Sequence, residues 1–227
     1  PDYVCGLSLG EYSALSAAGV FDPETAIQVV RERGLAMEKA AEGVESAMMA
    51  ILGLEREPLL DICVGCDGYV SIANYNCPGQ LVIAGEKKAV EEAGQKALDH
   101  GARRAVPLNT SGPFHTKLLK DASTRLHEVF KDVTFHEMNV PVIFNCTGKE
   151  LEDCSVQEML EKQVMSPVYF EDSIRTMINN GVDTIIEIGP GKVLSGFVRK
   201  IDRKIKTYQV EDMASLQKCV EAFNETK

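Results

Sequence analysis

The five residues at positions 6–10, Gly-Leu-Ser-Leu-Gly, constrain the fold of this chain more than any other segment. They fit the pattern G-x-S-x-G and lie between an apolar run at 3–5, typical of the end of a buried strand, and a helical stretch from about Gly10 to Ala18. Glycine on both sides of Ser8 permits a sharp, strained turn. The segment therefore predicts that the chain opens with a strand, a tight turn and a helix.

The rest of the chain alternates between expected strands and helices. Asp22 is suited to cap a second helix, with Pro23 at its first position. Further strands are predicted at 141–144 and 183–188, and further helices at about 118–130, 170–179 and 193–200. This alternation is typical of an α/β fold with a largely parallel sheet covered on both faces.

Residues 46–108 interrupt this alternation. They predict strands at 48–52, 69–73, 81–84 and 104–108, with helices at 58–63 and 86–98. The order strand, helix, strand, strand, helix, strand is ferredoxin-like. We therefore expect two domains: a parallel-sheet, α/β-hydrolase-like large subdomain built from 1–45 and 109–227, and an inserted ferredoxin-like small subdomain at 46–108.

Composition excludes several classes of function. The net charge of −10 argues against non-specific nucleic-acid binding, and the apolar runs are too short to span a bilayer. Seven scattered cysteines suit reduced thiols, and the lone pair Cys63 and Cys66 lacks the further ligands of a closed zinc site, so no metal is expected. A cytoplasmic protein is expected. Because the chain begins at Pro1 without methionine, a lost targeting segment and an organelle matrix stay open.

The turn at 6–10 is the first candidate catalytic feature. Such a turn exposes the Ser8 hydroxyl, and it directs the backbone N–H of Leu9 and the helix dipole to the place where an oxyanion would form. The alternative is a glycine-lined turn with a purely structural role. A nucleophilic serine also needs a base. Among the four histidines, His115 stands out because residues 111–116 hold it in a tight turn just ahead of a helix, although a structural histidine remains the alternative.

Arg33 is the third informative residue because it falls inside the apolar stripe of its predicted helix. A buried guanidinium is costly unless it is paired. Either Arg33 makes an internal ion pair, or it clamps a substrate carboxylate through its planar fork. A serine, a base and a carboxylate clamp together describe acyl transfer from a dicarboxylic thioester.

A basic stretch lies between positions 192 and 206. It is opposed only by Asp202 and contains Lys192, Arg199, Lys200, Arg203, Lys204 and Lys206. One interpretation is a solvated helix end, and the other is a surface for an acidic partner. The preceding Gly-Pro-Gly-Lys at 189–192 lacks the spacing of a phosphate-binding loop, so it predicts only a turn onto a helix.

Six ordered motifs resemble one family over the whole chain. The nucleophile segment is at 6–15, an arginine motif at 33–37, a small-subdomain signature at 74–80, a histidine motif at 111–115, and two further segments at 163–168 and 187–194. In these motifs the chain resembles the malonyl-CoA:acyl carrier protein transacylases of fatty-acid synthesis.

The resemblance implies a role for each matching residue. Ser8 would carry the malonyl group from malonyl-CoA to the phosphopantetheine thiol of acyl carrier protein, with His115 as base and the backbone carbonyl of Gln163 orienting its ring. Arg33 would hold the free carboxylate, and Phe114 resembles the malonyl-selecting form of the motif. No bound cofactor is implied. Carrier proteins of this pathway are acidic, so the basic stretch is a candidate docking patch for them.

The chain departs from the family pattern in two places. Leu7 stands where the family usually has histidine, which puts details of acyl recognition in doubt. The family's N-terminal portion, with the first strand and a Gly-Gln-Gly turn that completes the oxyanion hole, is also missing. Loss of one such donor costs about 10²–10³-fold in rate, so the activity of this chain by itself is left open. An exposed sheet edge is also expected.

Three alternatives remain beside this interpretation. A serine hydrolase or thioesterase would share the turn around Ser8, but it would want a buried carboxylate behind the histidine. An acyltransferase domain of a polyketide synthase would perform the same chemistry. An inactive fragment that acts only as a binding module is the non-enzymatic alternative.

Overall fold

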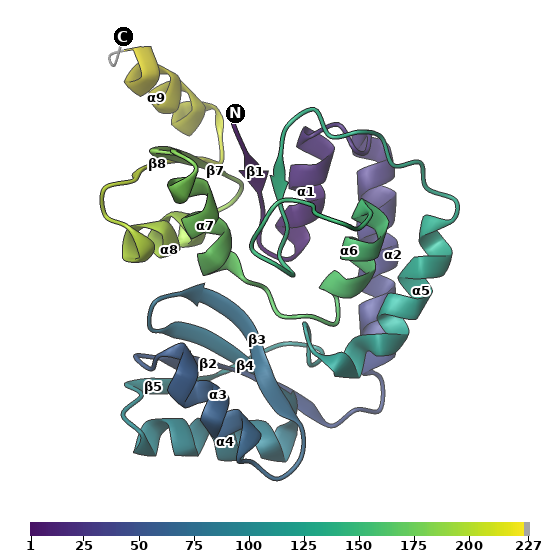
Figure 1. Cartoon of the computed structure of the whole chain (residues 1–227), viewed down its shortest axis with the longest axis vertical. Coiled ribbons are helices and arrows are strands. Elements are labelled where there is room, and N and C mark those ends of the chain that lie inside the picture. Colours follow the sequence, from purple (N-terminus) through teal and green to yellow (C-terminus); the bar gives the residue numbers. More distant parts are fainter. Residues whose placement is uncertain (225–227) are drawn as a thin grey trace. The chain divides into compact units, whose positions relative to one another are not determined.

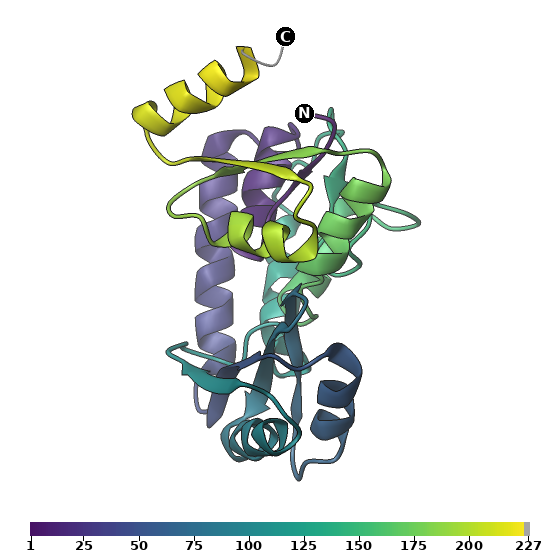
Figure 2. The same ribbon diagram turned by 90° about the vertical axis from the view of Figure 1, so that its left-hand side faces the viewer.

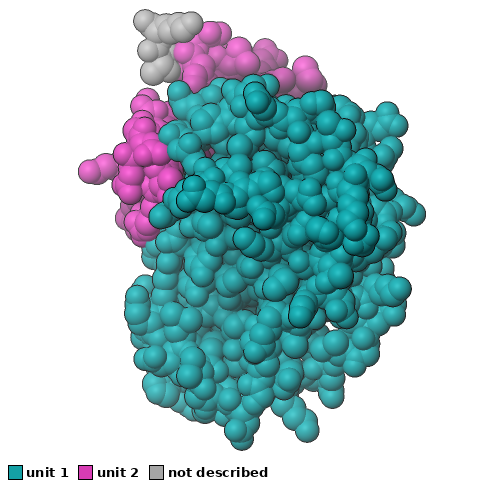
Figure 3. Space-filling model, turned by 45° about the vertical axis from the view of Figure 1, so that its right-hand side comes forward, with its two compact units in different colours: residues 1–173 teal, residues 174–227 magenta. Residues whose placement is uncertain are grey.

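A computed structural model describes residues 1–224 of the chain and has an α/β fold (Figure 1). The chain divides into two compact units, residues 1–173 and 174–227 (Figure 3). In the described part, the named strands form two parallel pairs and one four-stranded antiparallel sheet. The α/β class is therefore confirmed, and the sheets are mixed.

The first unit opens with the predicted strand, turn and helix. Strand β1 (Val4–Cys5) pairs in parallel with β6 (Val142–Ile143), and Ser8 lies between β1 and α1 (Leu9–Ala17). The long helix α2 (Pro23–Ala41) lies beside α1 (Figure 2), and it also packs against α5 (Lys120–Phe130). Helix α5 follows the short 3-10 turn η1 (Lys117–Leu119), and α6 (Val156–Gln163) comes after β6 in the chain.

Helix α2 begins where the sequence predicts. The Asp22 carboxylate accepts hydrogen bonds from the backbone N–H groups of Glu24 and Thr25, both at 2.9 Å, and Pro23 occupies the first turn. These bonds satisfy two N–H groups that have no acceptor inside the helix. The capped start sets the register of α2 and with it the face on which Arg33 lies.

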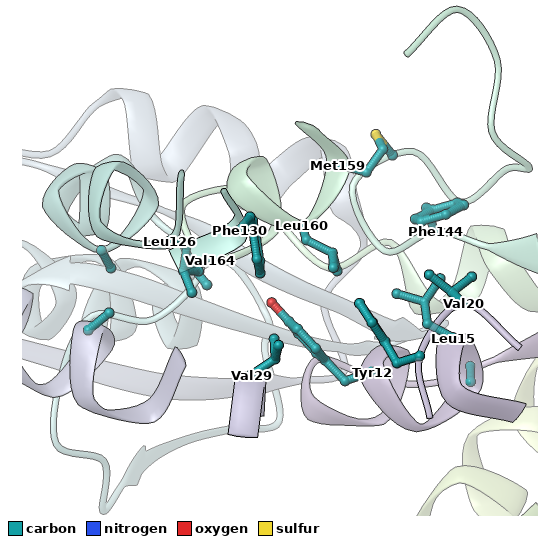
Figure 4. Packing of buried hydrophobic residues seen from close by; sticks show 14 of the residues in the cluster. Tyr12, Leu15, Val20, Val29, Leu126, Phe130, Phe144, Met159, Leu160 and Val164 are labelled. Carbon is teal, nitrogen blue, oxygen red and sulfur yellow. The ribbon is translucent and has the colours of Figure 1, made fainter. Parts of the chain in front are cut away.

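The apolar core beneath the turn at Ser8 joins α1, α2, α5 and α6 (Figure 4). Tyr12 and Leu15 of α1 are fully buried, as are Leu126 of α5 and Leu160 of α6. Burial of each large side chain contributes about 1.5–3 kcal/mol. Because Tyr12 is one helical turn beyond Ser8, this core also holds the start of α1 in place.

Residues 46–108 form a sheet and two helices of their own within the first unit. The antiparallel sheet has the strand order β3-β4-β2-β5, and α3 and α4 cover one of its faces with a separate apolar cluster. The elements are β2 (Ser46–Leu52), α3 (Arg56–Val64), β3 (Val70–Cys77), β4 (Gln80–Glu86), α4 (Lys87–Asp99) and β5 (Arg104–Leu108).

Strand β3 is longer than predicted. It continues to Cys77 and pairs with β4 across a tight turn in which Gly79 has φ +67°. That backbone conformation favours glycine. The chain after α6 returns to the edge of β3, since Tyr75 N–H donates to the Val168 carbonyl at 2.9 Å and Val168 N–H to the Ala73 carbonyl at 2.8 Å. These bonds place the segment that follows Gln163.

The second unit contains a parallel pair and two helices. Strands β7 (Thr184–Ile188) and β8 (Lys206–Val210) pair in parallel, with α8 (Val193–Ile201) between them in sequence and α9 (Met213–Asn224) after them. Helix α7 (Phe170–Asn179) begins in the first unit and ends in the second. Strand β8 and helix α9 were not predicted from the sequence.

None of the helices within residues 1–224 is both long enough and apolar enough to cross a membrane.

Candidate active site

Ser8 lies in the sharp turn that the glycines predict. Its backbone has φ +53° and ψ −102°, a strained conformation for a residue with a side chain. Gly6 is required by close approach, because a Cβ there would collide with the backbone of Gly10. The backbone N–H of Leu9, at the first position of α1, has no intrahelical acceptor and makes no hydrogen bond with the described residues. It is available for a ligand.

His115 contacts Ser8 directly. The Ser8 Oγ and His115 Nε2 atoms are 2.7 Å apart, and His115 Nδ1 lies 2.9 Å from the backbone carbonyl oxygen of Gln163. A carbonyl oxygen only accepts, so Nδ1 carries the proton and Nε2 is free to accept the proton of the serine hydroxyl. His115 also has a positive φ of +61°, and its N–H donates to the Val164 carbonyl at 3.2 Å.

The environment of His115 favours its neutral form. Burial, together with the positive charge of Arg33, lowers the pKa of His115 to about 4 from its ordinary 6.5. The hydrogen bond to Gln163 opposes this shift but does not reverse it. At neutral pH the imidazole is therefore unprotonated, as a base for Ser8 must be.

Arg33 extends from α2 to the serine. Its Nη2 donates to Ser8 Oγ at 2.9 Å, and both Nε and Nη2 donate to the side-chain oxygen of Gln163, at 3.2 and 3.1 Å. Its guanidinium lies over the ring of Tyr12 at 5.4 Å. No ion pair within residues 1–224 involves Arg33, although only 6% of the residue is exposed. The internal ion pair is therefore not formed, and the positive charge is held by neutral groups beside Ser8.

Gln163 has a larger part in the site than the sequence indicates. Its backbone carbonyl accepts from His115, its side-chain oxygen accepts from Arg33, and its Nε2 donates to the Ser8 carbonyl at 3.0 Å. One fully buried residue at the end of α6 thus contacts all three candidate groups. Sequence analysis assigned only the backbone contact.

Two residues at the turn were missed by sequence reasoning. The side chain of Asn145 contacts the backbone of Gly6 and Ser8, and the backbone N–H of Asn145 donates to the Glu11 carboxyl group at 2.5 Å. Glu11 is fully buried, and burial raises its pKa to about 8. Asn145 is 137 positions from Ser8, so no local pattern marks it, whereas Glu11 lies within the nucleophile segment at 6–15 and was given no role there.

Phe114 and the basic residues lie outside this hydrogen-bonded group. Phe114 is half-buried and packs against the core of the first unit and against a small cluster on the sheet of residues 46–108 that includes Met48 and Val82. The predicted basic residues belong to the second unit: Lys192 precedes α8, Arg199 and Lys200 lie in its last turn, and Arg203 and Lys204 precede β8.

Potential metal ligands and cysteines were located among residues 1–224. No group of three or more metal-ligating side chains is found there, and all seven cysteines are free thiols. Burial raises the pKa of Cys63 to about 12, so this thiol of the C-x-x-C pair is not primed as a nucleophile. The arrangement that can act chemically is therefore the hydroxyl of Ser8, with a neutral imidazole on one side and a guanidinium on the other.

Comparison with known proteins identifies the family of the chain. Residues 1–227 match the family model described as acyl transferase domain. The malonyl CoA-acyl carrier protein transacylase of Bacillus subtilis is 45% identical over 229 residues, which cover 99% of this chain and 72% of that protein.

Solved structures are similar over nearly the whole chain. The malonyl CoA-acyl carrier protein transacylase from Clostridium perfringens has a TM-score of 0.94 and 42% identity, covering 98% of this chain and 71% of that one. A malonyl-transacylase solved in complex with a type II PKS acyl-carrier protein has a TM-score of 0.94 and 38% identity, covering 98% and 73%. This chain belongs to the acyl transferase domain family.

Proposed function

We propose that this chain is an acyltransferase that moves a malonyl group from malonyl-CoA to the phosphopantetheine thiol of acyl carrier protein, in fatty-acid synthesis. The observation that carries the proposal is the contact of Ser8 Oγ with both His115 Nε2 and Arg33 Nη2. The names of the relatives, all malonyl transacylases acting with acyl carrier protein, support the substrates.

In the first half-reaction, Ser8 becomes acylated. His115 Nε2 takes the hydroxyl proton as Ser8 Oγ attacks the thioester carbonyl of malonyl-CoA. The backbone N–H of Leu9 donates to the oxyanion of the tetrahedral intermediate. The carbon–sulfur bond then breaks, and His115 returns the proton to the sulfur of coenzyme A. The product is a malonyl-serine ester.

In the second half-reaction, the thiol of the carrier protein attacks this ester. His115 accepts the thiol proton, the new thioester bond forms as the ester bond breaks, and Ser8 Oγ regains a proton from His115. Both half-reactions use one site, so ping-pong kinetics are expected. The scheme uses only these side chains and the two thiols, and it requires no cofactor.

Arg33 distinguishes this proposal from a serine hydrolase or thioesterase. A hydrolase would orient its histidine with a carboxylate, whereas His115 Nδ1 meets the neutral carbonyl of Gln163. The unpaired charge of Arg33, beside Ser8 Oγ, suits a bidentate bond to the free carboxylate of malonate. Phe114, next to His115, is proposed to limit the size of the acyl group.

Finer features of the molecule are proposed on the same basis. Residues 46–108 are a ferredoxin-like insert, supported by their strand order, and residues 1–45 with 109–227 are an α/β-hydrolase-like catalytic subdomain, supported by its parallel pairs. A docking patch for the acidic carrier protein lies on five basic residues of the second unit: Lys192, Arg199, Lys200, Arg203 and Lys204.

The transferase itself works in the cytoplasm.

Steady-state kinetics test the transferase against the hydrolase. We expect parallel lines in double-reciprocal plots when malonyl-CoA and holo-carrier protein are varied, with hydrolysis of malonyl-CoA far slower than transfer. Release of free malonate at the rate of coenzyme A release, whether or not carrier protein is present, would establish a hydrolase instead.

A further inference from the structure

The side chain of Asn145 makes an unusual pair of bonds with the turn that carries Ser8. Its Oδ1 accepts the backbone N–H of Ser8 at 2.6 Å, and its Nδ2 donates to the backbone carbonyl of Gly6 at 2.7 Å. Asn145 is 1% exposed, so neither bond competes with water. Both bonds are short. The side-chain amide accepts from one residue beside Leu7 and donates to the other.

This pattern continues the parallel ladder of β1 and β6. The register places Val4 opposite Val142 and Cys5 opposite Ile143, so the next two partners would be Gly6 with Phe144 and Leu7 with Asn145. In a parallel ladder one residue accepts from and donates to the two residues that flank its partner. The Asn145 amide bonds to the two residues that flank Leu7, as a backbone peptide group would.

The backbone after β6 cannot supply these bonds itself. The backbone N–H of Asn145 donates to the Glu11 carboxyl group, and its carbonyl accepts the Tyr169 N–H at 2.8 Å, so neither group is available to β1. The side chain of Asn145 therefore replaces the missing peptide group where the strained turn begins. With its side chain on the end of β1 and its backbone N–H on Glu11, Asn145 bonds both to the end of the strand and to the first turn of the helix.

We propose that Asn145 is a positioning residue that holds the turn in the conformation in which Ser8 Oγ points at His115. The bond to Asn145 occupies the N–H of Ser8 and leaves the N–H of Leu9 as the donor for the oxyanion. The inference rests on the proposed role of Ser8 as nucleophile. It assigns no contact with substrate to Asn145.

The test compares Asn145→Ala with Val90→Ala in the full chain. Val90 is fully buried in α4, within the apolar cluster of residues 46–108 and away from the hydrogen-bonded groups around Ser8. Val90→Ala therefore serves as a control that loses stability without touching the site. Two rates are measured: kcat for malonyl transfer, and the rate at which phenylmethanesulfonyl fluoride labels Ser8. That probe has no carboxylate for Arg33 to bind.

For Asn145→Ala we expect kcat and the labelling rate to fall together by about 10²-fold, because displacement of a nucleophile by about 1 Å has effects of that size. The KM for malonyl-CoA should change less than about threefold, since a positioning residue does not bind substrate. Val90→Ala, at a similar Tm, should keep both rates. If the alanine variant fails to fold, the isosteric Asn145→Asp takes its place. It keeps the acceptor for Ser8 N–H but loses the donor to Gly6, so both rates should again fall.

Three results would overturn the inference. They are a wild-type labelling rate in both Asn145 variants, a loss confined to KM, or an equal loss in Val90→Ala. The proposed function is judged separately, by whether the wild-type chain loads malonate on Ser8 at all. A wild-type chain that loads normally beside unimpaired Asn145 variants would remove only the positioning role.

Discussion

At the residue scale, the neutral state of His115 determines how the rate depends on pH. Its pKa is lowered to about 4, so the base is unprotonated above that value and protonated below it. The kcat/KM for malonyl-CoA, which reports the free enzyme, should therefore stay level from about pH 8 down to about pH 5 and fall below this. An acidic limb centred near the ordinary histidine pKa of about 6.5 would contradict the environment described here.

Arg33 links this titration to the substrate. Its charge is one cause of the lowered pKa of His115, and a bound carboxylate would neutralise that charge. The acidic limb of kcat, which reports the enzyme with substrate bound, should then lie at higher pH than the limb of kcat/KM for malonyl-CoA. Acetyl-CoA, which has no carboxylate, is the control. With acetyl-CoA the acidic limbs of kcat and of kcat/KM should lie at the same pH.

Selectivity is the second consequence of Arg33. Removal of a bidentate, charge-assisted bond should lower kcat/KM for malonyl-CoA by about 10²–10³-fold in Arg33→Ala. The kcat/KM for acetyl-CoA should change by less than about tenfold, so the ratio of the two constants should collapse. Transfer assays with both thioesters measure this ratio. Arg33→Lys is the control, because it keeps the positive charge but lacks the planar guanidinium. Equal losses with both thioesters would show that Arg33 acts on Ser8 and does not bind the carboxylate.

Glu11 predicts a pH dependence of stability. Its pKa is about 8 in the folded chain and near 4.5 when exposed, so between these values the folded state binds more protons than the unfolded state. The free energy of unfolding should therefore fall as pH rises through this window. Glu11→Gln keeps an acceptor for Asn145 N–H but does not titrate.

Denaturant unfolding at several pH values checks this. The advantage of Glu11→Gln over the wild-type chain should grow by up to about 1.4 kcal/mol for each pH unit between about 4.5 and 8. A difference that is constant across this range would mean that Glu11 is ionised in the folded chain.

The site residues predicted from the sequence have local sequence patterns, whereas the contacts that were missed join distant segments. Ser8 and Arg33 have local signatures, a glycine pair at a strand end and a charge within an apolar stripe. The side-chain contacts of Gln163 and Asn145 join segments 155 and 137 positions apart, and each depends on the side chain's final orientation. No periodicity or turn pattern carries that information, so these contacts emerge only in the folded chain.

At the scale of elements, α8 and the turn that follows it carry the proposed docking patch. Reversal of charge in Arg199→Glu with Arg203→Glu should raise the KM for acyl carrier protein by about tenfold or more, because complementary charges steer association. The KM for malonyl-CoA should not change. Raised salt should weaken carrier-protein binding in the wild-type chain and much less in the double variant.

A matched control separates the patch from net charge. Lys87→Glu with Lys88→Glu reverses two exposed charges at the start of α4, on the insert, and alters net charge by the same amount. If both double variants raise the carrier-protein KM equally, the effect belongs to overall charge, and the docking patch is wrong.

Elements with strong local signals were predicted well. The capped start of α2 and the alternation of strands and helices in 46–108 correspond to observed elements. Strand β8 was missed because Lys-Thr-Tyr-Gln-Val is largely polar, and it is set by pairing with β7. Strand β6 is only two residues long because the backbone N–H and carbonyl of Asn145 bond to Glu11 and Tyr169 and not to β1.

At the scale of the whole molecule, the α/β class and the family were predicted from ordered motifs, whereas the distribution of strands over sheets was not. Sheet membership depends on pairing between distant segments, as in β1 with β6, and a single sequence records strand propensity without recording partners. All the proposed catalytic groups, from Ser8 to Gln163, belong to the first unit, residues 1–173. The groups proposed to load malonate on Ser8 therefore lie within one compact unit.

The most direct test of this loading is a single-turnover experiment with radiolabelled malonyl-CoA, quenched and analysed by mass spectrometry. We expect a malonyl ester on Ser8 that passes to added holo-carrier protein, and no label in Ser8→Ala. Label on another residue, or an ester on Ser8 that is released only to water when carrier protein is present, would contradict it.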